Sequence, residues 1–189
     1  MTHIHEDMIA SSSHNFFIVD AEPYILERGW VTMKLSQEMM KILEGEHFLT
    51  YLCTSSKDGK PSARLVGVLP SEDMSEIYVG SGRLNKAERD LNQNKKAMMV
   101  FYSLSKLKAT GYKVENYFEI KGFQVECQLQ RTIKNKEDPI FRSIYDVTKE
   151  AVNEDEAKLI KSVHIFKIEQ IYDCSAEGEG KPITSKDPS

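Results

Sequence analysis

Hydrophobic and polar positions alternate most clearly between Phe48 and Tyr102. Three apolar runs come first, FLTYLCT, ARLVGVL and EIYVG, and turn-forming residues separate them at 57–61 (KDGKP) and 70–73 (PSED). Because β-branched and aromatic residues fill the runs and Asp-Gly is a strong hairpin signal, we predict three antiparallel strands. A short polar helix and a fourth apolar run, AMMVFY, complete this stretch.

Helix signals lie on both sides of the stretch. Ser36 is a good N-cap for a short helix, and Gly45 is its expected stop. Asp138-Pro139 predicts the start of a second helix, because proline is tolerated at the first helical position. A further helical piece is expected at 154–162.

Two later segments read as strands, 117–129 and 163–172, and Gly122 interrupts the first as at a bulge or a barrel bend. The strands follow one another by hairpins rather than alternating with long helices. The sequence therefore predicts a mainly β fold, an antiparallel barrel or closed sheet with flanking helices. We expect an N-terminal arm at 1–31, one domain at 32–174 and a flexible tail at 175–189.

Composition narrows the class of protein. The 189 residues and 40% apolar content suit one domain with a real core, and the net charge of -4 disfavours a general nucleic-acid binder. Three widely spaced cysteines without a CxxC disfavour a disulfide framework or a zinc site. There is neither a long apolar run nor a signal-peptide pattern, so we expect a cytoplasmic protein without a membrane partner.

The histidines give no convincing site. His3, His5 and His14 invite a metal interpretation, but nothing nearby supplies a rigid ligand frame, so no metal site is expected. His47 and His164 stand beside or within apolar runs and are interpreted as structural. Catalytic residues stay unassigned. If the protein is an enzyme, the difficult chemistry should belong to a cofactor.

The junction between the third strand and its helix is the best candidate for chemistry. Asn85 is a good N-cap and Glu88 completes a capping-box pattern, so the helix is expected to begin at Lys86. Free backbone N–H groups and the helix dipole favour an anion there. The same segment also offers Gly80, Ser81, Gly82 and Arg83. These residues predict a phosphate site; the alternative is an ordinary turn with solvated basic side chains.

The second strand adds a further cation. Alternation puts Arg64 and Val66 on one face and Leu65 and Gly67 on the other. An arginine between apolar neighbours is costly to bury unless it is paired. Arg64 is therefore either a phosphate or carboxylate clamp or an edge-facing side chain. Gly67 either lets a flat ring lie against the strand or marks a bend.

Together these features resemble a known family. The span from about Met39 to Tyr172 resembles the FMN-binding split-barrel family, the pyridoxamine 5′-phosphate oxidase-like flavoproteins. The segment NKAERDLNQNKKAMMV carries most of the likeness: in the family a lysine starts the helix, and an Asn-containing turn precedes the next strand. The small FMN-binding proteins of the family look closer than the true oxidases.

The resemblance implies a homodimer of six-stranded antiparallel split barrels, with FMN at the subunit interface. Lys86 matches the lysine that holds the flavin phosphate. The other cofactor-binding residues implied by position are Arg64, Leu65, Val66, Gly67, Ser81, Gly82, Asn85, Tyr102 and Ser103. The C-terminal part lacks the tryptophan and arginine motif of the true oxidases, so pyridoxamine phosphate oxidation is not expected.

Three functions follow as alternatives. The first is an FMN-dependent oxidoreductase with a small-molecule electron donor or acceptor. The second is a non-enzymatic flavin binder that acts as electron carrier, store or sensor; some relatives use deazaflavin or haem instead of FMN. The third is a small-barrel nucleic-acid binder using Lys95, Lys96 and 105–113, which the acidic charge balance opposes.

Overall fold

The computed structural model describes residues 32–44, 48–104, 109–110, 113–114, 120–175, 178 and 180–183, with the backbone alone at 109–110 and 113–114. The chain divides into two units, Met1–Val31 and Thr32–Ser189, and all of the described residues belong to the second. The predicted arm at 1–31, the expected helix stop at Gly45, His47 and most of the basic run at 105–113 lie outside the described residues.

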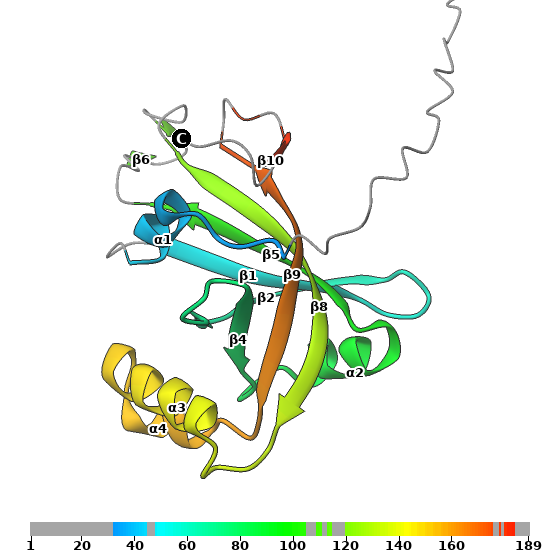
Figure 1. Ribbon diagram of the computed structural model, residues 1–189, viewed down its shortest axis with the longest axis vertical. Helices are drawn as coiled ribbons and strands as arrows, with labels where there is room; N and C mark the ends of the chain where they lie inside the picture. The colour runs from blue at the N-terminus through cyan, green and yellow to red at the C-terminus, as the bar shows by residue number, and fades with distance from the viewer. Residues whose placement is uncertain are drawn as a thin grey trace, which may run out of the picture. The chain divides into compact units, whose positions relative to one another are not determined.

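An antiparallel sheet forms the body of the second unit (Figure 1). Its strands are β1 (Phe48–Ser55), β2 (Pro61–Leu65), β3 (Val68–Pro70), β4 (Glu76–Gly80), β5 (Lys96–Ser103), β8 (Gly122–Ile133), β9 (Val163–Asp173) and β10 (Pro182–Ile183). They lie in the order β2-β1-β5-β8-β9-β4-β3, with β10 paired to β9. A separate small sheet joins β6 (Ala109–Thr110) and β7 (Lys113–Val114).

The predicted second strand is in fact two strands on opposite edges of the sheet. β2 pairs with β1 and β3 pairs with β4, and only Val66 and Gly67 join them. The prediction of one continuous strand is wrong because the chain leaves one edge of the curled sheet and enters the other. With β2 and β3 taken as one interrupted strand and β10 left out, the sheet has the six strands that the resemblance implies. The mainly β split-barrel prediction is confirmed.

The core lies inside the curl of the sheet. Fully buried side chains from five strands and α2 fill it, among them Leu52, Val79, Leu91, Met99, Phe101, Phe123, Val125 and Phe166. The rings of Phe101 and Phe123 stack with centroids 4.5 Å apart. β8 begins at Gly122, and residues 117–119 of the predicted strand lie outside the described residues. Of the two alternatives for Gly122, the bulge is wrong, because β5 and β8 pair without a shift up to this residue; the register shifts lie at Glu126/Cys127 and Leu129/Arg131.

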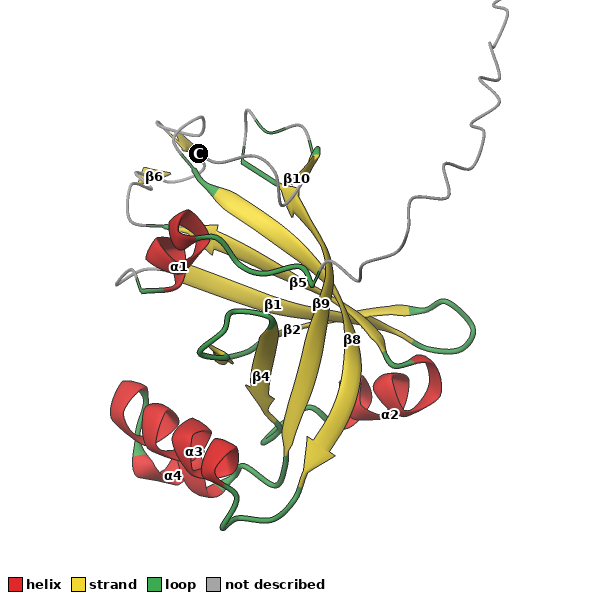
Figure 2. Cartoon of the chain, viewed as in Figure 1, coloured by secondary structure: helices red, strands yellow, loops and turns green. Residues whose placement is uncertain are grey.

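In the described part of the chain four helices flank the sheet (Figure 2), namely α1 (Gln37–Leu43), α2 (Asn85–Asn94), α3 (Pro139–Ala151) and α4 (Glu154–Lys158). The predicted caps of α1 and α3 are confirmed: the Ser36 side chain accepts from the Met39 N–H, and Asp138 accepts from the Ile140 N–H, with Pro139 in the first turn. None of the described helices is long and apolar enough to cross a membrane.

Candidate cofactor site

Helix α2 begins one residue earlier than the capping pattern predicts. Its N-cap is Leu84, and no side chain bonds to the helix N-terminus there. Glu88 does not close a capping box, because its carboxylate accepts a hydrogen bond from the Ser81 hydroxyl instead. The predicted Asn85 cap is therefore wrong. Because no side chain caps α2, its first N–H groups have no side-chain acceptor. These free N–H groups and the positive end of the helix dipole favour the binding of an anion.

Lys86 lies in the first turn of α2 and is tied to a buried acid. Its ammonium donates to Asp90 Oδ2 over 3.0 Å, and the Thr54 hydroxyl of β1 donates to the same oxygen over 2.9 Å. Asp90 and Thr54 are buried, whereas the Lys86 side chain is 39% exposed. These hydrogen bonds, the one from Lys86 above all, lower the pKa of Asp90. The lysine thus reaches from a buried carboxylate to the surface.

Arg64 lies on the same face of the sheet as this network. It stands opposite Leu52, two residues along β1 from Thr54, and directly opposed residues of an antiparallel pair project from one face. Helix α2 contacts both β1 and β2. Arg64 is exposed, and no described residue places a carboxylate within ion-pair distance of it. The fold therefore brings Arg64 and Lys86 to one side of the β1–β2 pair.

Three other residues of the predicted second strand are among those expected to bind the cofactor, and they differ in exposure and in the sheet face that they occupy. Val66 is half-buried, and its N–H donates to the Thr50 carbonyl, which extends the pairing of β2 with β1. Leu65 projects from the opposite face, where it is 60% exposed beside Tyr51. Gly67 is open, since an added Cβ would meet no atom within 4 Å.

The residues of the turn before α2 make their contacts with other residues of the chain. Ser81 is buried, and its hydroxyl contacts Glu88 and lies 2.7 Å from the Ser162 hydroxyl. Gly82 packs closely on Leu159, and the Arg83 guanidinium donates to Glu156 over 2.6 Å. The Ser81 hydroxyl and the Arg83 charge are thus both engaged within the chain.

His164 completes the buried contacts behind this turn. Its Nδ1 lies 3.0 Å from the Thr132 hydroxyl, and its Nε2 lies 3.5 Å from Glu88 Oε1. Burial lowers the pKa of His164, and the neighbouring Glu88 carboxylate opposes the shift only in part. A neutral, buried imidazole agrees with the structural role that the sequence suggests.

Tyr102 and Ser103 lie away from the cradle formed by Arg64 and Lys86. They end β5 opposite Leu49 and Phe48, whereas Lys86 is linked through Asp90 to Thr54. The six residue-to-residue steps from Phe48 to Thr54 span about 20 Å of strand at roughly 3.3 Å each. The structure therefore does not bring these two residues to the charged end of the site.

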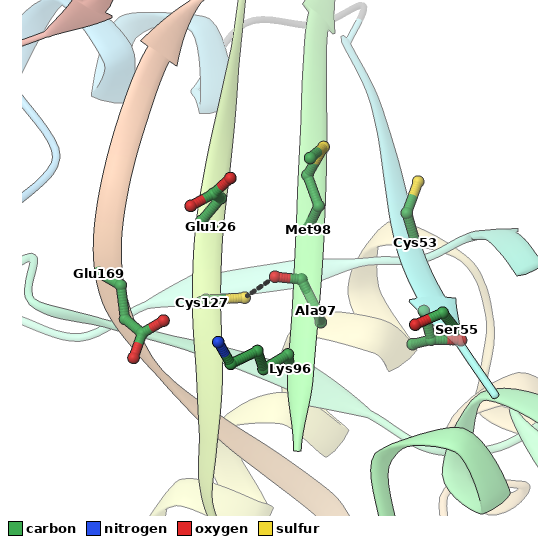
Figure 3. Close-up of a pocket in the computed structure, with 9 residues that line it drawn as sticks. Cys53, Ser55, Lys96, Ala97, Met98, Glu126, Cys127 and Glu169 are labelled. Carbon is green, nitrogen blue, oxygen red and sulfur yellow. Dashed lines mark hydrogen bonds between the residues drawn. The ribbon is translucent and has the colours of Figure 1, made fainter. Parts of the chain in front are cut away.

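A groove of about 330 Å³ opens on the other face of the sheet (Figure 3). Cys53 and Met98 lie opposite each other on β1 and β5, and Glu126 follows on β8. Glu169 and Lys96 complete its charged lining. Two carboxylates against one ammonium make this groove a poor place for a phosphate, in contrast to the Arg64 and Lys86 side.

A comparison with models of protein families identifies the family of this chain. A sequence model described as pyridoxamine 5′-phosphate oxidase matches residues 35–173. The chain belongs to this family. No curated protein matches it significantly.

Solved structures share its fold at low identity. HupZ of Group A Streptococcus is 13% identical with a TM-score of 0.57, over 79% of this chain and 99% of that one. An FMN-binding protein from Syntrophomonas wolfei is 16% identical with a TM-score of 0.54, over 71% and 82%. HutZ, described as the heme storage protein of Vibrio cholerae, is 12% identical with a TM-score of 0.52, over 75% and 95%.

Sequence reasoning missed Asp90 and Thr54. Asp90 stands four residues after Lys86, one helical turn away, and this spacing is visible in the sequence. Its bond to Thr54 joins residues 36 apart in the chain, and only the fold brings them together.

Proposed function

We propose that this protein binds FMN, and that Lys86, Arg64 and the first N–H groups of α2, including that of Asn85, hold the flavin phosphate. The observation that carries the proposal is the placement of Arg64 and Lys86 on one side of the β1–β2 pair, with Lys86 in the first turn of a helix that has no side-chain cap. Each of these features favours a phosphate, and the chain belongs to a family with FMN-binding relatives in fold.

The donor set fits a flavin phosphate better than a haem. A phosphate needs cationic and N–H donors, and Arg64 has no carboxylate partner among the described residues. Haem iron is commonly held by an axial histidine. His164, the one histidine in the described part of the chain, is buried between Thr132 and Glu88. The donors that the described residues offer beside α2 are therefore those of a phosphate site, as FMN would require.

The chain's own residues bind and orient the flavin. Lys86 and Arg64 would neutralise the phosphate, and Leu65 and Val66 would contact the rest of the flavin, as the family likeness implies. The open backbone at Gly67 leaves room for a flat ring to approach. Bound FMN supplies a centre that accepts and releases hydride or electrons, so a small-molecule donor and acceptor are the expected partners.

A homodimer is part of the proposal. Tyr51 and Leu65 face each other across β1 and β2 and remain 38% and 60% exposed. Exposed apolar side chains that meet on one sheet face favour a protein partner. A second copy of the chain, with FMN near the interface as the family likeness implies, would cover them.

A cytoplasmic location is also part of the proposal. Cys53, Cys127 and Cys174 are free thiols, which supports it.

The second candidate function is a flavin binder without enzymatic turnover. Near the cradle the acid Asp90 is already bonded to Lys86 and Thr54, and no general acid or base is assigned there. Reduction of the bound flavin by NADH or NADPH, followed by turnover on an acceptor, would separate an oxidoreductase from a carrier.

Titration of the apo-protein with FMN and with riboflavin tests the binding proposal itself. The two ligands differ only by the phosphate. We expect FMN to bind clearly more tightly, with a preference that weakens as salt rises, because the phosphate contacts are ionic. Equal affinity for the two ligands would remove the phosphate site from the account.

A further inference from the structure

The pairing of Lys86 with Asp90 is unusual for a helix. A lysine in the first turn stands at the positive end of the helix dipole, where a cation is disfavoured, and lysine before the acid at this spacing is the weaker order of the pair. The acid is also buried, and a buried carboxylate is costly unless it is bonded. This pair therefore does little for the helix alone.

An exposed pair elsewhere in the chain shows the contrast. Lys158 and Glu154 of α4 have the same spacing with the acid first, and both side chains are more than half exposed. That pair has the favourable order and lies at the surface. Asp90, in comparison, is only 5% exposed and is fixed from below by Thr54.

The hydrogen bond from Thr54 to Asp90 connects Lys86 to the β1–β2 pair, in which β2 carries Arg64. Thr54 pairs with Ser62 on β2, and Arg64 follows two residues later on the same face. A lysine ammonium has three N–H donors, and among the described residues only Asp90 accepts one from Lys86. Two donors remain for a ligand at the exposed end.

We infer that Asp90, anchored by Thr54, is a positioning residue that holds the Lys86 ammonium beside Arg64, and thereby gives the site its preference for a phosphorylated flavin over the unphosphorylated one. This inference rests on the proposed FMN function. It adds a buried pair, Thr54 and Asp90, that touches no ligand and acts through Lys86.

Thr54→Val tests the inference, because it removes the hydroxyl with little change of volume and leaves every charge in place. We expect FMN to bind about tenfold more weakly, the scale of one hydrogen bond to a charged group, with riboflavin affinity unchanged. Thr54→Ser should restore FMN affinity. In a Lys86→Ala background, Thr54→Val should change FMN affinity less than about twofold, since coupled residues are not additive.

Asp90→Asn provides a second test if Thr54→Val fails to fold. Positioning predicts a smaller preference for FMN over riboflavin, whereas mere screening of Lys86 by Asp90 predicts tighter FMN binding. Tighter binding overturns the inference, as does a Thr54→Val effect that persists without Lys86 or weakens both ligands equally. If the unaltered protein does not prefer FMN, the proposed function itself is wrong and the inference falls with it.

Discussion

At the scale of single residues, the site depends on charges placed against local preference. Lys86 stands at the positive end of α2, and Arg64 stays exposed without a carboxylate partner among the described residues. The helix dipole disfavours the cation of Lys86 in the first turn, and the charge of exposed Arg64 contributes nothing to stability without a partner. Both are explained if a phosphate completes the site.

The first prediction concerns Lys86. Lys86→Ala should weaken FMN binding by roughly 1.5–3 kcal/mol, the scale of a charge-assisted hydrogen bond, and leave the chain folded but with a lower free energy of unfolding, because buried Asp90 loses its cationic partner. Titration of apo-protein measures this. Lys158→Ala is the matched control, since it removes a lysine from an ion pair of the same spacing in α4. Unchanged FMN affinity in the Lys86 variant would remove this lysine from the phosphate site.

The second prediction concerns His164, whose pKa burial lowers below its ordinary value of 6.5. In the window between these two pKa values the unfolded chain binds the proton and the folded chain does not. The free energy of unfolding should therefore fall as pH drops below about 6.5. Urea unfolding between pH 8 and 5 measures the slope. His164→Gln should flatten it, and an identical slope in the variant would contradict the buried neutral imidazole.

At the scale of elements, the start of β8 depends on a close approach between its backbone at Gly122 and strand β5. A Cβ on Gly122 would lie 2.4 Å from Tyr102 Cδ1 and 2.7 Å from the Phe101 carbonyl oxygen, so β5 and β8 can pair there only around a glycine. Gly67 lies between β2 and β3 in open space. The two glycines thus have opposite roles in the sheet.

The third prediction compares these glycines. Gly122→Ala should lower the free energy of unfolding by about 1–3 kcal/mol, because the backbone oxygen cannot move aside as a flexible side chain would. Gly67→Ala is the matched control and should change it by less than about 0.5 kcal/mol. Chemical denaturation of both variants provides the measurement. Equal losses would mean that β5 and β8 do not approach as closely as described.

The sequence predicts elements better than it predicts their ends and partners. Local chemistry is enough to place the caps of α1 and α3, since Ser36 and Asp138 bond within their own turns. The break of the 62–70 run into β2 and β3 depends on the curl of the whole sheet and has no local signal. In the site, Lys86 and Arg64 are recognisable by pattern, but the Thr54–Asp90 bond exists only through tertiary packing.

At the scale of the whole molecule, the described domain leaves one sheet face partly uncovered. Leu65 and Tyr51 lie on that face of β1 and β2. The described residues leave these two side chains exposed, and the proposed homodimer would bury them. Measuring the oligomeric state therefore tests whether a second copy of the chain covers Leu65 and Tyr51.

The fourth prediction is a change of mass in solution. The unaltered protein should have twice the mass of one chain by light scattering, and Leu65→Glu should shift it toward the single-chain mass by placing a charge in the contact. Val152→Glu is the control, because Val152 is 61% exposed on the α3 side of the domain. A dimer that persists in the Leu65 variant would place the contact elsewhere.

The absorbance spectrum of the purified protein, with mass spectrometry of the molecule that heat releases from it, tests the central claim most directly. The account predicts a flavin spectrum and the mass of FMN. A haem or deazaflavin spectrum would contradict FMN as the cofactor while leaving the barrel in place. A colourless protein that also binds no added FMN would contradict the proposed function.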